Sequence, residues 1–502
     1  MAKAKPDSSK NSFGNTSKHG SCTSFSAKPI PQASSSSLAT LEVEKRIKAF
    51  NLFPECDVNV VSNEVAVQTS KLVEKQFVFP VAGSPGPSAR ELGHYAGYYK
   101  LPHTFAARMF YFFFESRNSK KDPVVIWLTG GPGCSSELAL FYENGPFHFS
   151  NNLSLVWNDY GWDKASNILF IDQPTGTGFS YTTDRADIRH NETGISNDLY
   201  DFMQEFFKQH PAYVENDFYI TGESYAGHYI PAFAVRLHQG NKAKQGIHIN
   251  LKGFAIGNGQ TNPEIQYPEY PEYALNTSII THSDYVVIKQ LVPPCLQLSR
   301  SCETEGGSAC GEAYAACNNI LSQIRFKIGR LNSYDIRMKC DGLCYDFSAV
   351  ETFLRLESVR DALGIGDLCF VSCSEEVYNA MIRDWMRNYA VGIPGLLEDG
   401  IKVLVYAGEY DLVCNWIGNS KWVHAMTWSG QKEFGAAPTV PFVVDGVEAG
   451  QLKSHGPLSF LKVHNAGHLV PMDQPKASLQ MLQNWMQGKL TSSKAAEKVS
   501  PK

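Results

Sequence analysis

The 502-residue chain lacks several features that would place it with membrane or nucleic-acid-binding proteins. No stretch approaches the ~18 consecutive apolar residues that a membrane-spanning helix needs. The formal net charge is −5 and the sequence pI is near 6.3, so no excess of positive charge attracts nucleic acid. No internal repeats are visible. These absences predict no membrane span and no nucleic-acid partner.

The N-terminus lacks the apolar segment of a secretory signal peptide. Residues 1–40 are rich in serine and lysine, and Asp7 is their only acidic residue. This composition predicts disorder. A short helix is expected over 40–50, and the polar tail 491–502 is expected to be disordered.

The cysteines lack the paired C-x-x-C spacing that favours zinc. Twelve are present, and eight of them fall between Cys295 and Cys373. This density is typical of disulfide-bonded proteins from an oxidising compartment. Sequons at Asn152, Asn191 and Asn276 are compatible with glycosylation there. We therefore expect disulfides, no metal site and no cofactor.

With 43% apolar residues, the chain can bury one large core. A hairpin is expected between 98 and 114, and helical periodicity is clear over 195–206 and 479–485. Strands are expected at 124–128, 167–171, 217–221, 251–256, 401–406 and 459–463. This alternation predicts an α/β fold with a mostly parallel sheet flanked by helices. Between about 260 and 388 the alternation stops, which predicts a cysteine-rich helical insertion covering the strand ends.

Ser224 lies at a strand-to-helix turn, within Gly222-Glu223-Ser224-Tyr225-Ala226-Gly227. Such a turn exposes a serine hydroxyl above the sheet, and small flanking residues allow its strained backbone. Ala226 stands where the usual G-x-S-x-G pattern has its second glycine. The pattern predicts a nucleophile, although a chance Ser/Gly turn is the alternative.

A serine nucleophile needs a base, and the base needs an orienting acid. Asp411 and His468 each follow a predicted strand, in the chain order Ser, Asp, His of sheet hydrolases. Glu409 and His464 are the rivals for these two roles. Chain order and position after a strand leave both acids and both histidines open as partners of Ser224.

A glycine-rich loop, Thr129 to Cys134, directly follows the predicted strand 124–128. Glycines let backbone N–H groups approach the oxygen that becomes negative in a tetrahedral intermediate. Taken alone, the loop would be interpreted as a tight Gly/Pro turn. Beside the triad, we interpret it as part of an oxyanion hole.

The segments 127–136 and 220–227, together with Asp172-Gln173-Pro174, 411–416 and Gly467-His468, resemble serine carboxypeptidases of the plant carboxypeptidase III-like branch. The resemblance covers roughly residues 90–488. It implies an α/β-hydrolase fold and a vacuolar or secreted glycoprotein that acts on peptide or protein C-termini at acid pH. It also implies a propeptide within 1–90, a catalytic domain over 91–490, and an insertion that shapes the substrate pocket.

The resemblance also implies roles for individual residues. Because Asp411 and His468 match the family motifs, it selects them over Glu409 and His464, and the predicted triad is Ser224, Asp411 and His468. The N–H groups of Gly131 and Tyr225 would form the oxyanion hole, and Cys414 would lie by the substrate pocket as a free thiol. The substrate carboxylate would be bound by Trp127, Thr129, Gly130, Glu143 and Glu223. Thr129 stands where the widespread family pattern has asparagine. The implied disulfides are Cys134–Cys373, Cys295–Cys317, Cys302–Cys310 and Cys340–Cys344.

These residues predict a serine-type exopeptidase. The first alternative is an acyltransferase that uses glucose esters. Acyltransferases related to this family tend to carry aspartate where Glu223 stands. The second alternative is a binding protein on an inactive hydrolase fold, against which the intact triad and glycine loop argue.

Overall fold

The computed structural model describes residues 72–79, 93–150, 153–341 and 344–490. The expected helix over 40–50, the propeptide boundary near residue 91, the Asn152 sequon and the tail 491–502 lie outside these residues. In the part of the chain that is described, no helix has the length and apolar character needed to cross a membrane.

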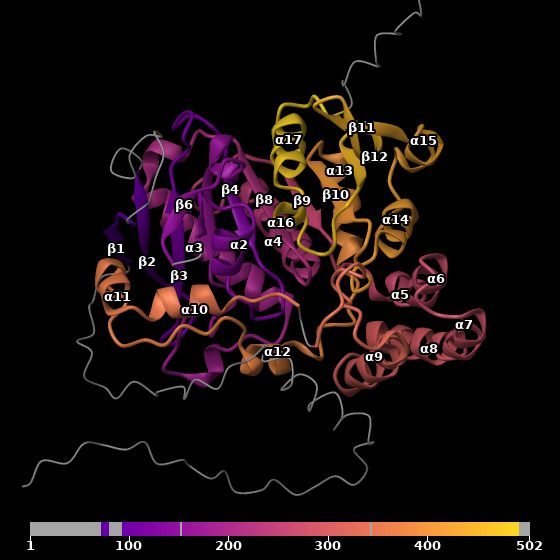
Figure 1. Cartoon of the computed structure of the whole chain (residues 1–502). Coiled ribbons are helices and arrows are strands. Elements are labelled where there is room, and N and C mark those ends of the chain that lie inside the picture. Colours follow the sequence, from indigo (N-terminus) through magenta and orange to yellow (C-terminus); the bar gives the residue numbers. More distant parts are fainter. Residues whose placement is uncertain (1–71, 80–92, 151–152, 342–343, 491–502) are drawn as a thin grey trace, which may run out of the picture.

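Eleven of the described strands form one mixed sheet in the order β1-β2-β3-β7-β4-β8-β9-β10-β13-β12-β11 (Figure 1). The antiparallel strands at the first edge are β1 (Leu72–Gln76), β2 (His94–Lys100) and β3 (Arg108–Phe114). The parallel centre consists of β7 (Asn167–Ile171), β4 (Val124–Leu128), β8 (Phe218–Glu223), β9 (Leu251–Gly257), β10 (Lys402–Gly408) and β13 (Leu458–Val463). The far edge is antiparallel, with β12 (Val447–His455) and β11 (Val440–Val444). A separate two-stranded sheet pairs β5 (Phe147–Phe149) with β6 (Leu155–Trp157).

The central strands are apolar throughout because both faces of the sheet are covered. In β4, Val124, Ile126 and Leu128 point into one core, whereas Val125 and Trp127 point into the other. All five are fully buried. This arrangement confirms the predicted α/β fold, in a mixed sheet whose centre is parallel and whose edges are antiparallel.

Helices cover both faces of the sheet. One core includes residues of α3 (Glu192–Gln209), α4 (Ala226–Lys242), α12 (Glu375–Met381), α13 (Ile393–Glu398), α14 (Trp416–Ala425) and α15 (Gln431–Ala436). The other core includes residues of α2 (Glu137–Tyr142), α10 (Ser348–Arg355), α11 (Glu357–Leu363), α16 (Val470–Asp473) and α17 (Pro475–Met486). Short 3₁₀ helices lie at η1 (Trp162–Lys164), η2 (Arg185–Asp187), η3 (Pro211–Tyr213) and η4 (Tyr389–Gly392). The Asn191 side chain caps α3 by accepting a hydrogen bond from Gly194 N.

The insertion divides into two parts that pack differently (Figure 1). The first part has a small core of its own and contains α5 (Pro263–Gln266), α6 (Glu269–Asn276), α7 (His282–Lys289), α8 (Val292–Glu305) and α9 (Ser308–Ile328). Two disulfides, Cys295–Cys317 and Cys302–Cys310, join α8 to α9. The second part, with α10 and α11, packs instead against the sheet core beside Phe141, whose ring lies 5.6 Å from that of Phe353.

The first part of the insertion contacts the loop that follows β10. The Tyr270 and Tyr273 hydroxyls donate to the carbonyls of Val413 and Glu409, at 2.7 and 2.8 Å. The second part is tied to the loop after β4 by the Cys134–Cys373 disulfide. Cys340–Cys344 is the fourth disulfide, so the structure joins the same four pairs that the resemblance implied.

Candidate active site

Ser224 occupies the turn between β8 and α4 with a left-handed backbone, φ +66°. This conformation is costly for a residue with a side chain, so surrounding contacts must hold it. Ser224 N donates to Gly257 O at 3.1 Å, and Ser224 O accepts from Gln260 N at 2.9 Å. At Gly222 a Cβ would stand 2.2 Å from Leu128 O, so this position requires glycine. The hydroxyl-bearing residue remains partly exposed.

Asp411 and His468 form a direct pair beyond the ends of β10 and β13. The Nδ1 atom of His468 lies 2.7 Å from Asp411 Oδ2, and both side chains are buried. Because Nδ1 faces a carboxylate, it carries the proton, and Nε2 is the nitrogen able to accept one. Tyr334 packs edge-on against the imidazole, with ring centroids 4.9 Å apart. The pair therefore has the geometry of a base and its orienting acid.

Further donors fix the Asp411 carboxylate. Val413 N donates to Oδ1 at 2.8 Å, and Cys414 N donates to Oδ2 at 3.1 Å. Asn258 Nδ2 also donates to Oδ2, at 2.8 Å. Asn258 follows Gly257, the acceptor for Ser224 N, so the end of β9 is bonded to both the nucleophile turn and the acid. Sequence reasoning missed Asn258, although it directly follows β9 just as Ser224 directly follows β8.

The two rival residues bond to each other instead. His464 Nδ1 lies 3.2 Å from Glu409 Oε2, and its Nε2 lies 3.3 Å from Glu448 Oε1. Glu409 therefore contacts His464, whereas Asp411 contacts His468. These contacts give His464 and Glu409 a partner outside the predicted triad.

The glycine loop after β4 lies directly against the nucleophile turn. A Cβ on Gly130 would stand 2.4 Å from Tyr225 N, and Gly131 has φ +108°. The loop is held from its other side by the Cys134–Cys373 disulfide. The two residues predicted to form the oxyanion hole, Gly131 and Tyr225, therefore belong to adjoining backbone segments.

Two buried carboxyl groups lie beside these segments. Glu223 ends β8 and is 2% exposed, while Glu143 follows α2 and is 6% exposed. Burial raises the pKa of Glu143 to about 8, and the charge of Asp473 adds to this rise. Burial, and next to it the charge of Glu143, holds the pKa of Glu223 well above its ordinary value. The pair therefore retains at least one proton at acid pH, and the two carboxyl groups titrate together.

The remaining predicted carboxylate-binding residues lie at the end of β4. Trp127 is fully buried, and its Nε1 donates to Thr129 Oγ1 at 3.0 Å. The threonine hydroxyl accepts this bond, so its own hydrogen is free for another acceptor. Thr129 is partly exposed. A threonine here therefore keeps a donor available at the position where the family pattern has asparagine.

Cys414 is the buried one of the two free cysteines among the described residues, and Cys369 is the exposed one. Burial, with the charge of Asp411, raises the pKa of the Cys414 thiol. Its Sγ and the polar atoms of Asp411 and His468 all lie within 4.8 Å of one another. Such a set resembles a metal site, but the hydrogen bond between Asp411 and His468 already engages two of its members.

The described sequons lie on the surface. Asn191 and Asn276 are both exposed, at the start of α3 and the end of α6. Asn191 accepts its capping bond through Oδ1, so Nδ2 is not used in the cap. Both positions are accessible to a glycosylating enzyme.

Comparison with known proteins identifies the family of this chain. The sequence pattern that defines the family "Serine carboxypeptidase" matches residues 85–488. Serine carboxypeptidase-like 48 of Arabidopsis thaliana is 64% identical, over 93% of both chains. Serine carboxypeptidase 3 of Oryza sativa subsp. japonica is 62% identical, over 91% of both. Among solved structures, Kex1(delta)p, a prohormone-processing carboxypeptidase from Saccharomyces cerevisiae, matches with a TM-score of 0.72 and 28% identity, covering 79% of this chain and 91% of that one. With its α/β-hydrolase fold, this chain therefore belongs to the serine carboxypeptidase family of hydrolases.

Proposed function

We propose that the protein is a serine-type exopeptidase that releases C-terminal residues from peptides and proteins at acid pH. The observation that carries this proposal is the 2.7 Å bond between His468 and Asp411, on loops at the same edge of the sheet as the strained turn of Ser224. A serine becomes a useful nucleophile only beside such an oriented base.

In the proposed reaction, His468 Nε2 takes the proton of the Ser224 hydroxyl while Oγ attacks the last peptide carbonyl. The N–H groups of Gly131 and Tyr225 donate to the oxygen that becomes negative. When the C–N bond breaks, the imidazolium returns its proton to the leaving amine, and an acyl-enzyme remains on Ser224. Water, deprotonated by His468, then hydrolyses this ester. Asp411 holds the imidazole in the required tautomer throughout.

Selectivity for a chain end is assigned to the buried carboxyl pair. A protonated Glu223 can donate a hydrogen bond to a substrate carboxylate, beside Thr129, Gly130 and Trp127. Two ionised glutamates would repel the same group. The proposed acid pH optimum follows from this requirement for a retained proton. Glu223 in place of aspartate also favours the peptidase over the acyltransferase.

We further propose that the chain is a vacuolar or secreted glycoprotein with a propeptide before about residue 91. Four disulfides support an oxidising compartment, because thiols stay reduced in the cytosol. The exposed positions of Asn191 and Asn276 are compatible with glycosylation.

The test compares the purified protein with its Ser224→Ala and His468→Ala variants on a blocked dipeptide acid and on a glucose ester. We expect hydrolysis of the dipeptide, loss of turnover in both variants, and fluorophosphonate labelling of Ser224 alone. Labelling of another serine would refute the assignment. Preferred transfer from the glucose ester would establish the acyltransferase instead.

A further inference from the structure

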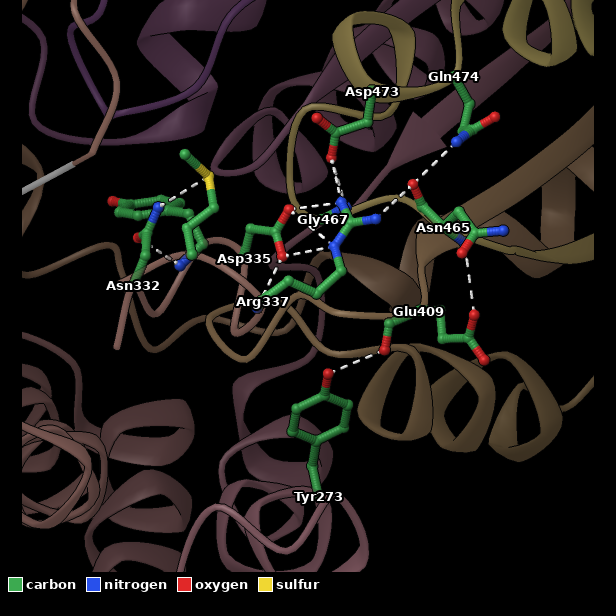
Figure 2. A network of polar contacts seen from close by, with 11 residues as sticks. Tyr273, Asn332, Asp335, Arg337, Glu409, Asn465, Gly467, Asp473 and Gln474 are labelled. Atoms are coloured by element: carbon green, nitrogen blue, oxygen red, sulfur yellow. Dashed lines mark hydrogen bonds and ion pairs between the residues drawn. The ribbon is translucent and has the colours of Figure 1, made fainter. Parts of the chain in front are cut away.

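Arg337, a residue of the insertion, binds Asp335 and also contacts the loop that carries Asp411; Figure 2 shows its bonds to Asp335. Its Nε donates to Asp335 Oδ1 at 2.9 Å and its Nη2 to Oδ2 at 2.5 Å, a two-pronged contact with a carboxylate that is 2% exposed. The guanidinium carbon lies 4.7 Å from the ring centroid of Tyr410, the residue before Asp411. A planar, forked cation suits this combination of stacking and paired hydrogen bonds, whereas an ammonium group does not.

The same guanidinium also holds the loop that carries His468 (Figure 2). Nη1 donates to Asn465 O at 2.9 Å, and Nη2 lies 3.3 Å from Asp473 Oδ2. That carboxylate oxygen in turn accepts from Gly467 N at 2.6 Å. Gly467 precedes His468. Arg337 is therefore linked to the backbone beside the catalytic imidazole by two short routes.

Backbone hydrogen bonds place the Arg337 segment between the two catalytic loops. His468 N donates to Tyr334 O at 2.8 Å, and Ile336 N donates to Tyr410 O at 3.1 Å. Tyr334 and Ile336 flank Asp335, the carboxylate that binds Arg337. The loop after β13 also contains Asn465 in a left-handed conformation, φ +55°, which persists only when its neighbours hold it.

We propose that Arg337 is a positioning residue for His468: its guanidinium sets the loop 464–468 against the loop after β10, and so holds the imidazole where Ser224 can use it. The inference rests on the proposed function of the triad. Catalytic groups must be held to within about half an ångström, and residues behind them supply that restraint. Arg337 itself touches no reacting atom.

The charges around Arg337 predict a second measurable effect of its loss, a change in the pH dependence of kcat/KM. Arg337 faces Asp335, Asp473 and the Tyr410 ring. The imidazole of His468 is faced by Asp411, Cys414 and Tyr334, and it also interacts with the charge of Asp473. Without the guanidinium, two carboxylates near the loop would lose their partner, and their negative charge would favour a protonated imidazole. The acid limb of the kcat/KM profile would then move to higher pH.

Two substitutions separate geometry from charge. Arg337→Lys keeps the cation and loses the fork, so we expect kcat to fall about 10- to 100-fold, with KM for a blocked dipeptide and the acid limb unchanged. Arg337→Met loses the positive charge as well as the forked geometry. We therefore expect the same fall in kcat and a shift of the acid limb of the kcat/KM profile to higher pH. Circular dichroism and thermal melting establish that each variant is folded.

The matched control is Arg189→Lys. Arg189 makes a two-pronged contact of similar length with Asp198 of α3, both bonds being 2.6 Å. The Arg189 side chain is 20% exposed and that of Arg337 is 37% exposed. We expect this variant to keep the kcat of the unaltered enzyme. A folded Arg337→Lys enzyme with unaltered kcat, or a loss confined to KM, would overturn the proposal. An equal loss in Arg189→Lys would also overturn it. An unaltered protein with no activity and no label on Ser224 would refute the proposed function instead.

Discussion

Gly130 and Tyr225 lie so close that a Cβ atom on Gly130 would stand 2.4 Å from the Tyr225 backbone nitrogen. The same atom would lie 2.7 Å from both Glu223 O and Ser224 Cβ. The glycine loop and the nucleophile turn are thus in direct backbone contact, which a larger residue would prevent. A residue larger than glycine at position 130 would therefore displace the glycine loop, the nucleophile turn, or both.

Gly130→Ala should therefore impair catalysis. The added methyl group displaces the loop from the Tyr225 N–H, and loss of one oxyanion donor costs about 10²- to 10³-fold in kcat. Single-turnover hydrolysis of a blocked dipeptide measures the effect. The control is Gly311→Ala in α9, where a Cβ meets nothing within 4 Å and should leave activity unchanged. Unaltered kcat in a folded Gly130→Ala enzyme would contradict the expectation.

From the buried carboxyl pair Glu143 and Glu223, we predict how substrate binding changes with pH. Burial raises the pKa of Glu143 to about 8 and that of Glu223 well above its ordinary value. In the proposed mode of binding, the pair keeps a proton at low pH and donates it in a hydrogen bond to the substrate carboxylate. As the pH rises, the pair loses this donor and repels the carboxylate. KM for a blocked dipeptide acid should therefore rise between about pH 5 and 8. KM for the matching amide, which carries no such charge, should change little.

Glu223→Gln, which cannot ionise, should flatten the rise in KM. Glu433→Gln is the matched control, because Glu433 is an exposed residue of α15 and its substitution should leave the pH profile as it was. Identical pH dependence for the acid and the amide would show that the pair does not recognise the substrate carboxylate. An esterase or endopeptidase activity would then become the better interpretation.

The Cys134–Cys373 disulfide should contribute more to stability than Cys302–Cys310. The first closes a separation of 239 residues and the second a separation of 8. In the chain-entropy account, the longer loop is worth about 3 kcal/mol more in free energy of unfolding. Urea unfolding of the two double Cys→Ser variants measures this difference. If both variants lost the same free energy of unfolding, the length of the closed loop would not determine how much a disulfide stabilises this protein.

Only the Cys134–Cys373 variant should also lose kcat, since Cys134 lies in the glycine loop. Two backbone bonds flank this disulfide, from Ser135 N to Ser372 O and from Ser374 N to Gly133 O, both at 2.8 Å. They should preserve part of the activity in the variant. Unchanged kcat would show that these bonds alone hold the loop.

Strand positions were predictable because buried parallel strands are apolar along their whole length. The bounds of β4 and β7 agree with prediction, and β9 and β13 differ by one residue at an end. The edge strands β1 and β11, and β12 beside β11, were not predicted. Edge strands mix exposed and buried residues: Val440, Val443 and Val447 are 37%, 40% and 69% exposed. Such strands carry no continuous apolar run that local sequence could reveal.

The sequence by itself determined the fold class and the residues that follow the central strands, Ser224, Asp411 and His468 among them. Both depend on local patterns: apolar runs, a small-residue turn, and the order of residue types along the chain. Only the tertiary structure decided that Asp411, and not Glu409, bonds to His468. It alone brought Asn258 to Asp411 across 153 residues, and Arg337 to Asn465 across 128. Such contacts, and the burial that raises the pKa of Glu143, arise from packing between distant segments, which no local pattern encodes.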